Sequence, residues 1–153
     1  MSAKPRQLIL MADDDSDDQL LVQDALRDCQ SGDPIRFVSN GEELMDYLLQ
    51  RGAYASAGTA PPPALILLDL NMPRKDGREA LREIRQHPDL RRIPVIVFTT
   101  SKADTDVDGL YDLGANCFVP KPTAYDALVK IMQALSHYWF GIAELPQPKM
   151  NRP

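Results

Sequence analysis

Cysteine and histidine, which ligate most protein-bound zinc ions, are scarce in this sequence. There are two residues of each kind among 153, and Cys29 and Cys117 do not stand at the spacing of a metal-ligand pair. Neither His87, which precedes a proline, nor His137, in a helical stretch, suggests a ligand or a phospho-donor. This scarcity excludes a zinc module and a disulfide-stabilised scaffold, and we expect both cysteines to be reduced and buried.

Positive charge and long apolar runs are lacking as well. The 17 Lys and Arg residues are outnumbered by 22 Asp and Glu residues, which gives a formal net charge of −5. Binding a nucleic-acid backbone requires clustered positive charge, and no basic run occurs, so we expect no nucleic-acid partner. No apolar run approaches the ~20 residues that span a membrane, and no cleavable signal opens the chain. We therefore expect a cytoplasmic protein without membrane contact.

The chain does contain a regular alternation of two kinds of segment. Five short apolar runs lack a period of two, which is typical of strands buried on both faces of a sheet. They are Leu8–Ala12, Ile35–Val38, Ala64–Leu68, Val95–Phe98 and Cys117–Val119. Between them, apolar residues recur at helical spacing, as in Val22, Ala25 and Leu26. Strands and helices in this order predict an α/β fold, a doubly wound parallel sheet with helices on both faces.

The composition of the remaining segments predicts the domain boundaries. We expect one domain over residues 7–141, with a short tail before it over 1–6 and a Pro-rich tail after it over 142–153. Residues 52–63, which include three consecutive prolines, predict a stiff loop. Thr123 is expected to cap the last helix, because a hydroxyl at that position accepts a hydrogen bond from the first turn.

Polar residues follow four of the five apolar runs. Asp13 and Asp14 follow the first, Asp69 the third, Thr99 the fourth, and Lys121 stands just past the fifth. In an open parallel sheet, ligands bind at the carboxyl ends of the strands. We therefore expect these side chains, which a hydrophobic core does not require, to converge on one edge of the sheet.

Electrostatics limits what such a site can hold. Two carboxylates about 5 Å apart repel each other by roughly 3 kcal/mol at an effective dielectric constant near 20. Lys121 supplies one positive charge, and a divalent cation could supply the rest. Oxygen ligands without histidine or cysteine select a hard ion, so the pattern predicts Mg²⁺. A metal, an ammonium and a hydroxyl around one carboxylate suit phosphoryl transfer.

These residues belong to a recognisable set of motifs. The set consists of MADDD over 11–15, LDLNMP over 68–73 with Asp76-Gly77, FTT over 98–100, and Lys121-Pro122. In this order the motifs resemble the response-regulator receiver domains of two-component signalling, over residues 6 to 141. The resemblance implies a flavodoxin-like receiver fold with strand order 2-1-3-4-5. Pro120 fits this order, because a proline belongs in an edge strand.

Longer segments resemble a subgroup, the single-domain regulators paired with bacterial and cyanobacterial phytochromes. They are LDLNMPRKDGREAL, LRRIPVIVFTTSKAD, GANCFVPKP and HYWFGIAELP. This resemblance implies a phosphorelay switch, not an enzyme with a substrate of its own, whose partner is a histidine kinase, with a bacteriophytochrome as the candidate. It also implies a homodimer formed through the fourth helix, fifth strand and fifth helix. The aromatic residues 138–140 agree with that, because three neighbours on a helix cannot all face inward.

Carried over position by position, the resemblance assigns Asp69 as the phospho-acceptor. Asp14 would bind Mg²⁺ directly, Asp13 would act mainly through a coordinated water, and Asp69 and the backbone carbonyl of Asn71 would complete the protein ligands. Lys121 would contact a phosphoryl oxygen. In this family the bond to the following proline, Pro122 here, is usually cis, which proline tolerates at small energetic cost.

The resemblance also implies a conformational switch. Thr99 would bind a phosphoryl oxygen through its hydroxyl, and Phe118 would turn into the space that Thr99 leaves. Many relatives have tyrosine at this position, so the outward state here lacks a phenol hydrogen bond. Asn71 and Ser101, two residues after the acceptor and two after the threonine, are expected to tune the lifetime of the acyl phosphate.

Two other functions are compatible with the same topology. A flavin-binding protein would need a Gly- and hydroxyl-rich phosphate loop after the first strand, where the acidic run Asp13–Asp18 would instead repel phosphate. Absorbance of the purified protein distinguishes that case. A docking module that works without phosphorylation would not need the polar residues at the strand ends. Within the acidic run, Asp15, Asp17 and Asp18 are expected to be solvated residues at a helix start.

Overall fold

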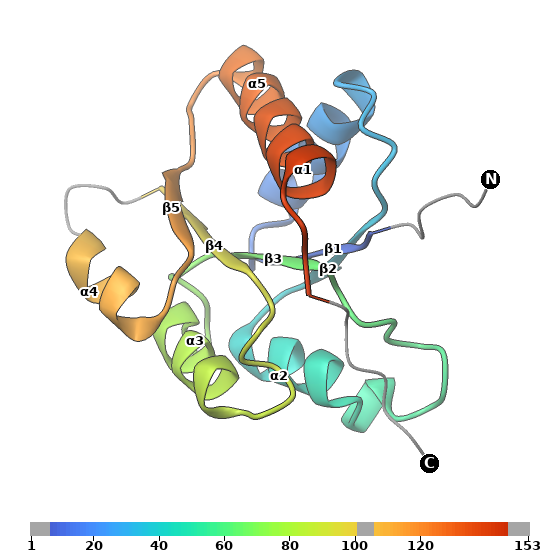
Figure 1. Cartoon of the computed structure of the whole chain (residues 1–153), viewed down its shortest axis with the longest axis vertical. Helices are drawn as coiled ribbons and strands as arrows, with labels where there is room; N and C mark the ends of the chain where they lie inside the picture. Colours follow the sequence, from blue (N-terminus) through green and yellow to red (C-terminus); the bar gives the residue numbers. More distant parts are fainter. Residues whose placement is uncertain (1–6, 101–105, 147–153) are drawn as a thin grey trace.

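Five parallel strands form a single sheet in the part of the chain that the structure, a computed structural model, describes, residues 7–100 and 106–146. The strand order is β2-β1-β3-β4-β5 (Figure 1), which confirms the predicted fold class and topology. The strands are β1 Ile9–Ala12, β2 Ile35–Val38, β3 Leu65–Leu68, β4 Val95–Thr99 and β5 Cys117–Pro120. The α-helices are α1 Ser16–Asp28, α2 Gly41–Leu49, α3 Gly77–Gln86, α4 Val107–Leu113 and α5 Tyr125–Ser136.

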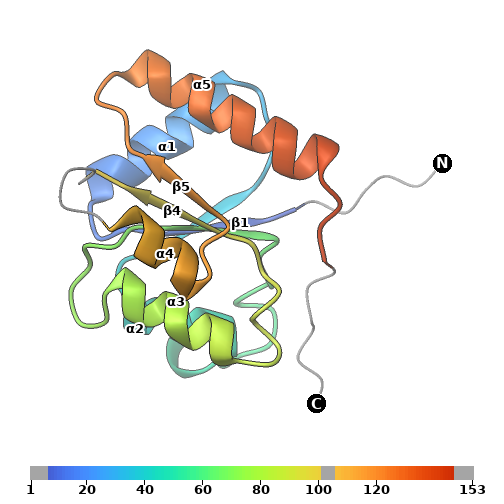
Figure 2. The same cartoon turned by 60° about the vertical axis from the view of Figure 1, so that its left-hand side comes forward.

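The helices cover the sheet in two layers. Figures 1 and 2 show α1 and α5 on one face, and α2, α3 and α4 on the other. Successive residues of β1 point to opposite layers: Ile9 and Met11 pack in the cluster beneath α1 and α5, whereas Leu10 and Ala12 pack in the cluster beneath α2 and α3. Both faces of the central strands are therefore buried, which explains why their sequences are continuously apolar.

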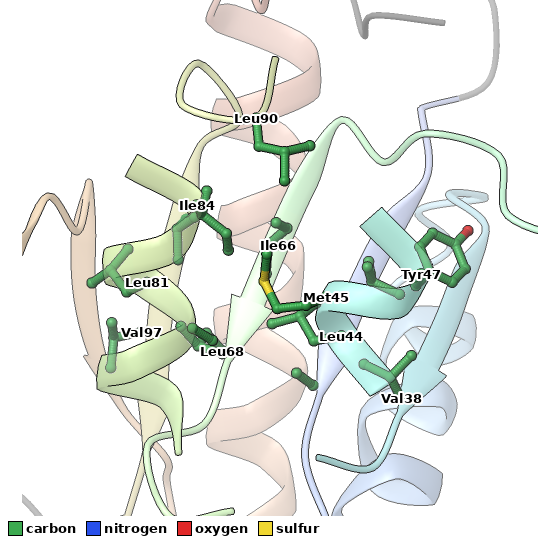
Figure 3. Packing of buried hydrophobic residues seen from close by; sticks show 14 of the residues in the cluster. Val38, Leu44, Met45, Tyr47, Ile66, Leu68, Leu81, Ile84, Leu90 and Val97 are labelled. Atoms are coloured by element: carbon green, nitrogen blue, oxygen red, sulfur yellow. The ribbon is translucent and has the colours of Figure 1, made fainter. Parts of the chain in front are cut away.

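The larger core cluster lies between the sheet and the α2–α3 layer. In Figure 3, Leu44 on α2 projects toward Ile66 and Leu68 on β3, and Leu81 on α3 lies beside Val97 on β4; all five residues are 0% exposed. Burying a leucine or isoleucine side chain contributes roughly 1.5–3 kcal/mol. The sheet is thus held from both sides, and its carboxyl edge is a rigid support for a site.

Most helix ends agree with the sequence, with one exception. The Asn40 side chain accepts a hydrogen bond from Glu43 N at 2.8 Å, and Gly114 ends α4 with φ of 109°. The exception is Thr123, which was expected to cap α5. The residue before the helix is Ala124, which has no side-chain cap. The prediction was wrong because the helix starts one residue later, at Tyr125, so that Thr123 lies outside the capping position.

The last helix continues beyond α5 as a π-helix, η2, over His137–Ile142. Trp139 and Phe140 pack against the cluster beneath α1 and α5, whereas Tyr138 is 52% and Ile142 is 61% exposed. The aromatic run therefore divides between core and surface. The proposed domain end at 141 stays a prediction, and most of the expected tail lies outside the described residues. No helix in the described ranges has the length and apolar content needed to cross a bilayer.

Two positions at the outer edge of the sheet, in β5, have no N–H available to a further strand. Pro120 has no N–H to offer, as expected for an edge strand. The N–H of Phe118 donates to the hydroxyl oxygen of Tyr111 on α4, at 3.3 Å. Side-chain capping and proline are both means by which natural sheets block edge-to-edge association.

Gly77, the first residue of α3, packs closely against the backbone of Asp69 and Leu70, and substitution of this glycine tests that packing. A β-carbon there would lie 2.4 Å from the carbonyl oxygen of Asp69 and 2.8 Å from Cα of Leu70. Because both obstacles are backbone atoms, we expect Gly77→Ala to lower the free energy of unfolding by about 1–3 kcal/mol in urea titrations. Gly141→Ala is the control, since its β-carbon would have an ordinary 3.7 Å contact. Equal stability of the two variants would contradict the close packing at Gly77.

Candidate functional site

The polar residues that follow the strands meet at the carboxyl edge of the sheet. In the described part of the chain, the buried polar or charged residues are Asp13, Asp69 and Thr99, at 0%, 7% and 0% exposure. All three belong to this one place. The gathering of three such residues at one place indicates a functional site, since buried polar groups are costly unless paired.

Backbone hydrogen bonds extend the sheet past the strand ends and fix these residues. Asp13 N donates to the Val38 carbonyl and Asp69 N donates to the Ala12 carbonyl, each at 3.0 Å. On the other side, Lys121 N donates to the Thr99 carbonyl at 2.9 Å. The site is therefore assembled by the strand register and not by flexible loops.

Lys121 and Thr99 hold the acidic side chains together. The Lys121 ammonium contacts Asp13 Oδ2 at 2.5 Å, Asp18 Oδ2 at 2.8 Å and Asp69 Oδ2 at 3.4 Å. The Thr99 hydroxyl donates to the other Asp69 oxygen at 2.9 Å. Both oxygens of Asp69 thus face donors that could equally bind the oxygens of a phosphoryl group attached there.

Asp13, Asp14 and Asp69 form a carboxylate cluster suited to a cation. One oxygen from each lies within 4.8 Å of the others. The ligand atoms are all oxygen, so the cluster fits a hard divalent ion such as Mg²⁺ or Mn²⁺. Asp14 and the nearby Asn71 are exposed, which leaves the cluster open to solvent on one side. The Asn71 N–H lies 3.4 Å from Asp69 Oδ1.

The ionisation of the site reflects the burial of its charged groups and their hydrogen bonds. Burial raises the pKa of Asp13 to about 6, although hydrogen bonds from Lys121 and from the Asp15 N–H act in the opposite direction. Burial alone would lower the pKa of Lys121, but its hydrogen bonds to Asp13 and Asp18 outweigh burial and raise that pKa. Lys121 therefore stays an ammonium, and one cation is left to balance several carboxylates.

The structure thus brings together Asp13, Asp14, Asp69, Thr99 and Lys121, as the strand-end pattern predicts. The cis bond expected before Pro122 is absent, since the described residues contain no cis peptide bond. The trans isomer is the ordinary one for a bond before proline, and Lys121 reaches the carboxylates with this bond trans.

Two further predicted residues lie outside this group. Phe118 is half-buried and packs against the cluster beneath α2 and α3. Ser101 lies outside the described residues, so its expected effect on phosphoryl lifetime stays a prediction.

Asp18 is a residue of the site that sequence reasoning missed. It was assigned to the solvated helix start with Asp15 and Asp17, yet its carboxylate is hydrogen-bonded to Lys121. A signal for this was present in the sequence. Asp18 precedes Val22 by four residues and Ala25 by seven, and both are buried on α1, so the helical period places all three on the inward face.

Comparison with known proteins identifies the class of protein to which this fold and site belong. The sequence model of the response regulator receiver domain family matches residues 9–133. The chain therefore belongs to this family. Receiver domains are signalling proteins that bind a divalent metal at such an acidic pocket.

Particular relatives extend over nearly the whole chain. Response regulator Rcp1 of Synechocystis sp. (strain ATCC 27184 / PCC 6803 / Kazusa) is 40% identical over 94% of this chain and 96% of that protein. The crystal structure of the phosphorylated cyanobacterial phytochrome response regulator RcpA matches with a TM-score of 0.84 at 40% identity, over 94% of this chain and 100% of that one. The Mn²⁺-bound form of Rcp1 matches with a TM-score of 0.82 at 40% identity, over 92% and 99% of the two chains.

The raised pKa of Asp13 predicts that its charge destabilises the cation-free protein. With a folded pKa of about 6 against an ordinary 3.8, folding favours the protonated acid, so stability is lost as the pH rises through 6. At about 1.4 kcal/mol per unit, the ionised group costs at most about 3 kcal/mol. At pH 7 and in the presence of a metal chelator, we expect the free energy of unfolding of Asp13→Asn to exceed that of the wild type by about 1–3 kcal/mol.

The difference should disappear between about pH 6 and pH 4, where the wild-type carboxyl becomes protonated. Urea unfolding followed by circular dichroism at several pH values measures it. Glu144→Gln is the control, because it removes one negative charge at an exposed position outside the helices. A variant less stable than the wild type at pH 7 would show that the contact with Lys121 outweighs burial and repulsion.

Proposed function

We propose that this protein is a phospho-accepting signalling switch in which Asp69 takes a phosphoryl group from a phosphohistidine of a partner kinase. The observation that carries the proposal is the placement of one carboxylate, Asp69, between the Thr99 hydroxyl and the Lys121 ammonium at 2.9 and 3.4 Å. The acidic cluster formed with Asp13 and Asp14 adjoins it. An isolated structural ion pair would need neither the hydroxyl nor the additional carboxylates.

The chemistry follows from the positions of these groups. A lone pair on an Asp69 carboxylate oxygen attacks phosphorus in line, and the bond from phosphorus to the histidine nitrogen breaks with its electron pair leaving on the imidazole. An acyl phosphate forms on Asp69. The Lys121 ammonium and the Thr99 hydroxyl each donate to an oxygen of the transferred group. Mg²⁺, held by Asp13, Asp14, Asp69 and the Asn71 carbonyl, would supply the remaining positive charge.

The proposed switch starts from the Thr99–Asp69 hydrogen bond. When the Thr99 hydroxyl turns to a phosphoryl oxygen, it moves toward the site and leaves space behind it. Phe118, on the neighbouring strand and half-buried, can then turn inward. Its movement would change the surface formed by α4, β5 and α5, and protein contacts there would carry the output. Asn71 and Ser101 flank the acceptor and would set how easily water reaches the acyl phosphate.

The proposed partner is a histidine kinase of the phytochrome type, in the cytoplasm. Similarity to Rcp1 and to the phytochrome response regulator RcpA supports this choice. Nucleic acid and membranes are not part of the proposal, in keeping with the net charge of −5. Self-catalysed loss of the phosphoryl group would reset the switch.

The central prediction is that Asp69 is the sole acceptor. Incubation with acetyl phosphate and Mg²⁺ should increase the intact mass of the protein by one phosphoryl group, and Asp69→Asn should show no increase. Asp112→Asn, which removes an exposed carboxylate of α4, should behave as the wild type does. A chelator should abolish the reaction in the wild type and in Asp112→Asn. Phosphorylation that persists in Asp69→Asn would overturn the proposed function.

We also propose that copies of the chain associate through α4, β5 and the last helix. The exposed apolar side chains of Tyr111 on α4 and of Tyr138 and Ile142 at the chain's last helical turns support such a contact. Sedimentation velocity with and without acetyl phosphate should reveal a dimer, and Ile142→Ser should weaken it several-fold, since a buried methylene contributes about 0.8 kcal/mol. A monomer in both phosphorylation states would contradict this proposal.

A further inference from the structure

Among the residues that the structure describes, Asp18 is the one acidic contact of Lys121 that does not belong to the carboxylate cluster. Its Oδ2 atom lies 2.8 Å from the Lys121 ammonium, closer than the 3.4 Å that separates this ammonium from Asp69. The side chain of Lys121 is only 8% exposed, and that of Asp18 is 30% exposed. A contact this sheltered is more than a surface ion pair, whose contribution is usually small.

The backbone around Asp18 is firmly placed. Asp15 caps α1 by accepting a hydrogen bond from Asp17 N at 2.9 Å. Gln19, the next residue after Asp18, donates from its side chain to the carbonyl oxygen of Asp13 at 2.7 Å. The first turn of α1 is therefore tied to the end of β1, and the Asp18 carboxylate approaches Lys121 from a fixed helix.

The three contacts of Lys121 would not all persist during phosphoryl transfer. An ammonium has three N–H donors, and here they face Asp13, Asp18 and Asp69. Asp13 and Asp69 belong to the cluster that fits a cation, and Asp69 is also the proposed acceptor. During phosphoryl transfer, their oxygens would therefore bind the cation or the phosphoryl group. The Asp18 carboxylate would bind neither, so its hydrogen bond to Lys121 can persist throughout the reaction.

We propose that Asp18 is a positioning residue for phosphoryl transfer: it holds the Lys121 ammonium beside Asp69 while Asp13 and Asp69 serve the cation and the phosphoryl group. This inference rests on the proposed function. Lysine is flexible, with four rotatable bonds and considerable side-chain entropy, so an anchor on the far side of the ammonium keeps one N–H aimed at the reacting oxygens. Asp18 itself touches neither the acceptor nor the phosphoryl group.

The test compares Asp18→Asn with Asp17→Asn. Asp17 stands in the same helical turn and is exposed, so its substitution removes the same charge at the same helix end without touching Lys121. Phosphorylation by acetyl phosphate at saturating Mg²⁺ should be about tenfold slower in Asp18→Asn, because an untethered Lys121 ammonium spends most of its time out of line with the reacting oxygens. Asp17→Asn should match the wild type. Asp18→Glu, which keeps the carboxylate, should recover part of the rate.

A second measurement reports on the lysine itself. In Mg²⁺-loaded but unphosphorylated protein, modification of Lys121 by an amine-specific acylating reagent, followed by peptide mass spectrometry, should be several-fold faster in Asp18→Asn than in Asp17→Asn. Half-saturation by Mg²⁺ should be the same in both, because neither side chain belongs to the cluster. Asp18→Ser, which lacks the charge and is smaller, should repeat the behaviour of Asp18→Asn.

The outcomes separate this inference from the function on which it rests. If the wild type takes no phosphoryl group, the proposed function fails. If the wild type reacts and Asp18→Asn matches Asp17→Asn in rate and in labelling of Lys121, the function stands and the positioning role is wrong. A faster reaction in Asp18→Asn would likewise overturn the proposal, because it would mean that Asp18 draws Lys121 away from Asp69.

Discussion

The contact between one ammonium and several carboxylates is the interaction on which the rest of this structure depends. Lys121 follows β5, the last strand, and its bonds to Asp13 and Asp18 join the end of that strand to the first strand and helix. The acids need this cation because they repel one another in a setting that excludes much of the water. Burial raises the pKa of Asp13 to about 6 even with Lys121 beside it. A divalent ion bound to the cluster would add positive charge next to these acids.

The remainder of the fold provides a nonpolar support for this polar edge. The strands contribute side chains to clusters on both faces, and the buried polar or charged residues of the described ranges all stand at the site. In the proposed switch, the change at the site passes through packed apolar groups. Phe118 is suitably placed among them, because it is half-buried in a strand next to that of Thr99.

Much of this organisation could be predicted from the sequence, and the reasons are specific. Continuous apolar runs define buried strands, and polar residues after the runs must then share one edge, so the positions of Asp69 and Lys121 followed from topology alone. The role of Asp18 could not be predicted in this way, because Asp18 lies on a helix. There the direction of a side chain depends on the helical period of about 3.6 residues and not on the end of a strand. Thr123 and Pro122 show a different limit. A helix start that moves by one residue, or a peptide bond with two isomers of similar energy, depends on local packing that a motif does not specify.

The closed edge at β5 affects how copies of this chain can meet. With Pro120 in the strand and the Phe118 N–H directed to Tyr111, the sheet offers little for a neighbouring strand to extend, and continuous intermolecular sheets are disfavoured on this side. Association there must use side chains. The affinity of main-chain pairing would not depend on the orientation of a single aromatic ring. The affinity of an interface made by side chains would. The same features of the edge that disfavour polymerisation therefore make binding at this surface depend on the conformation of its side chains.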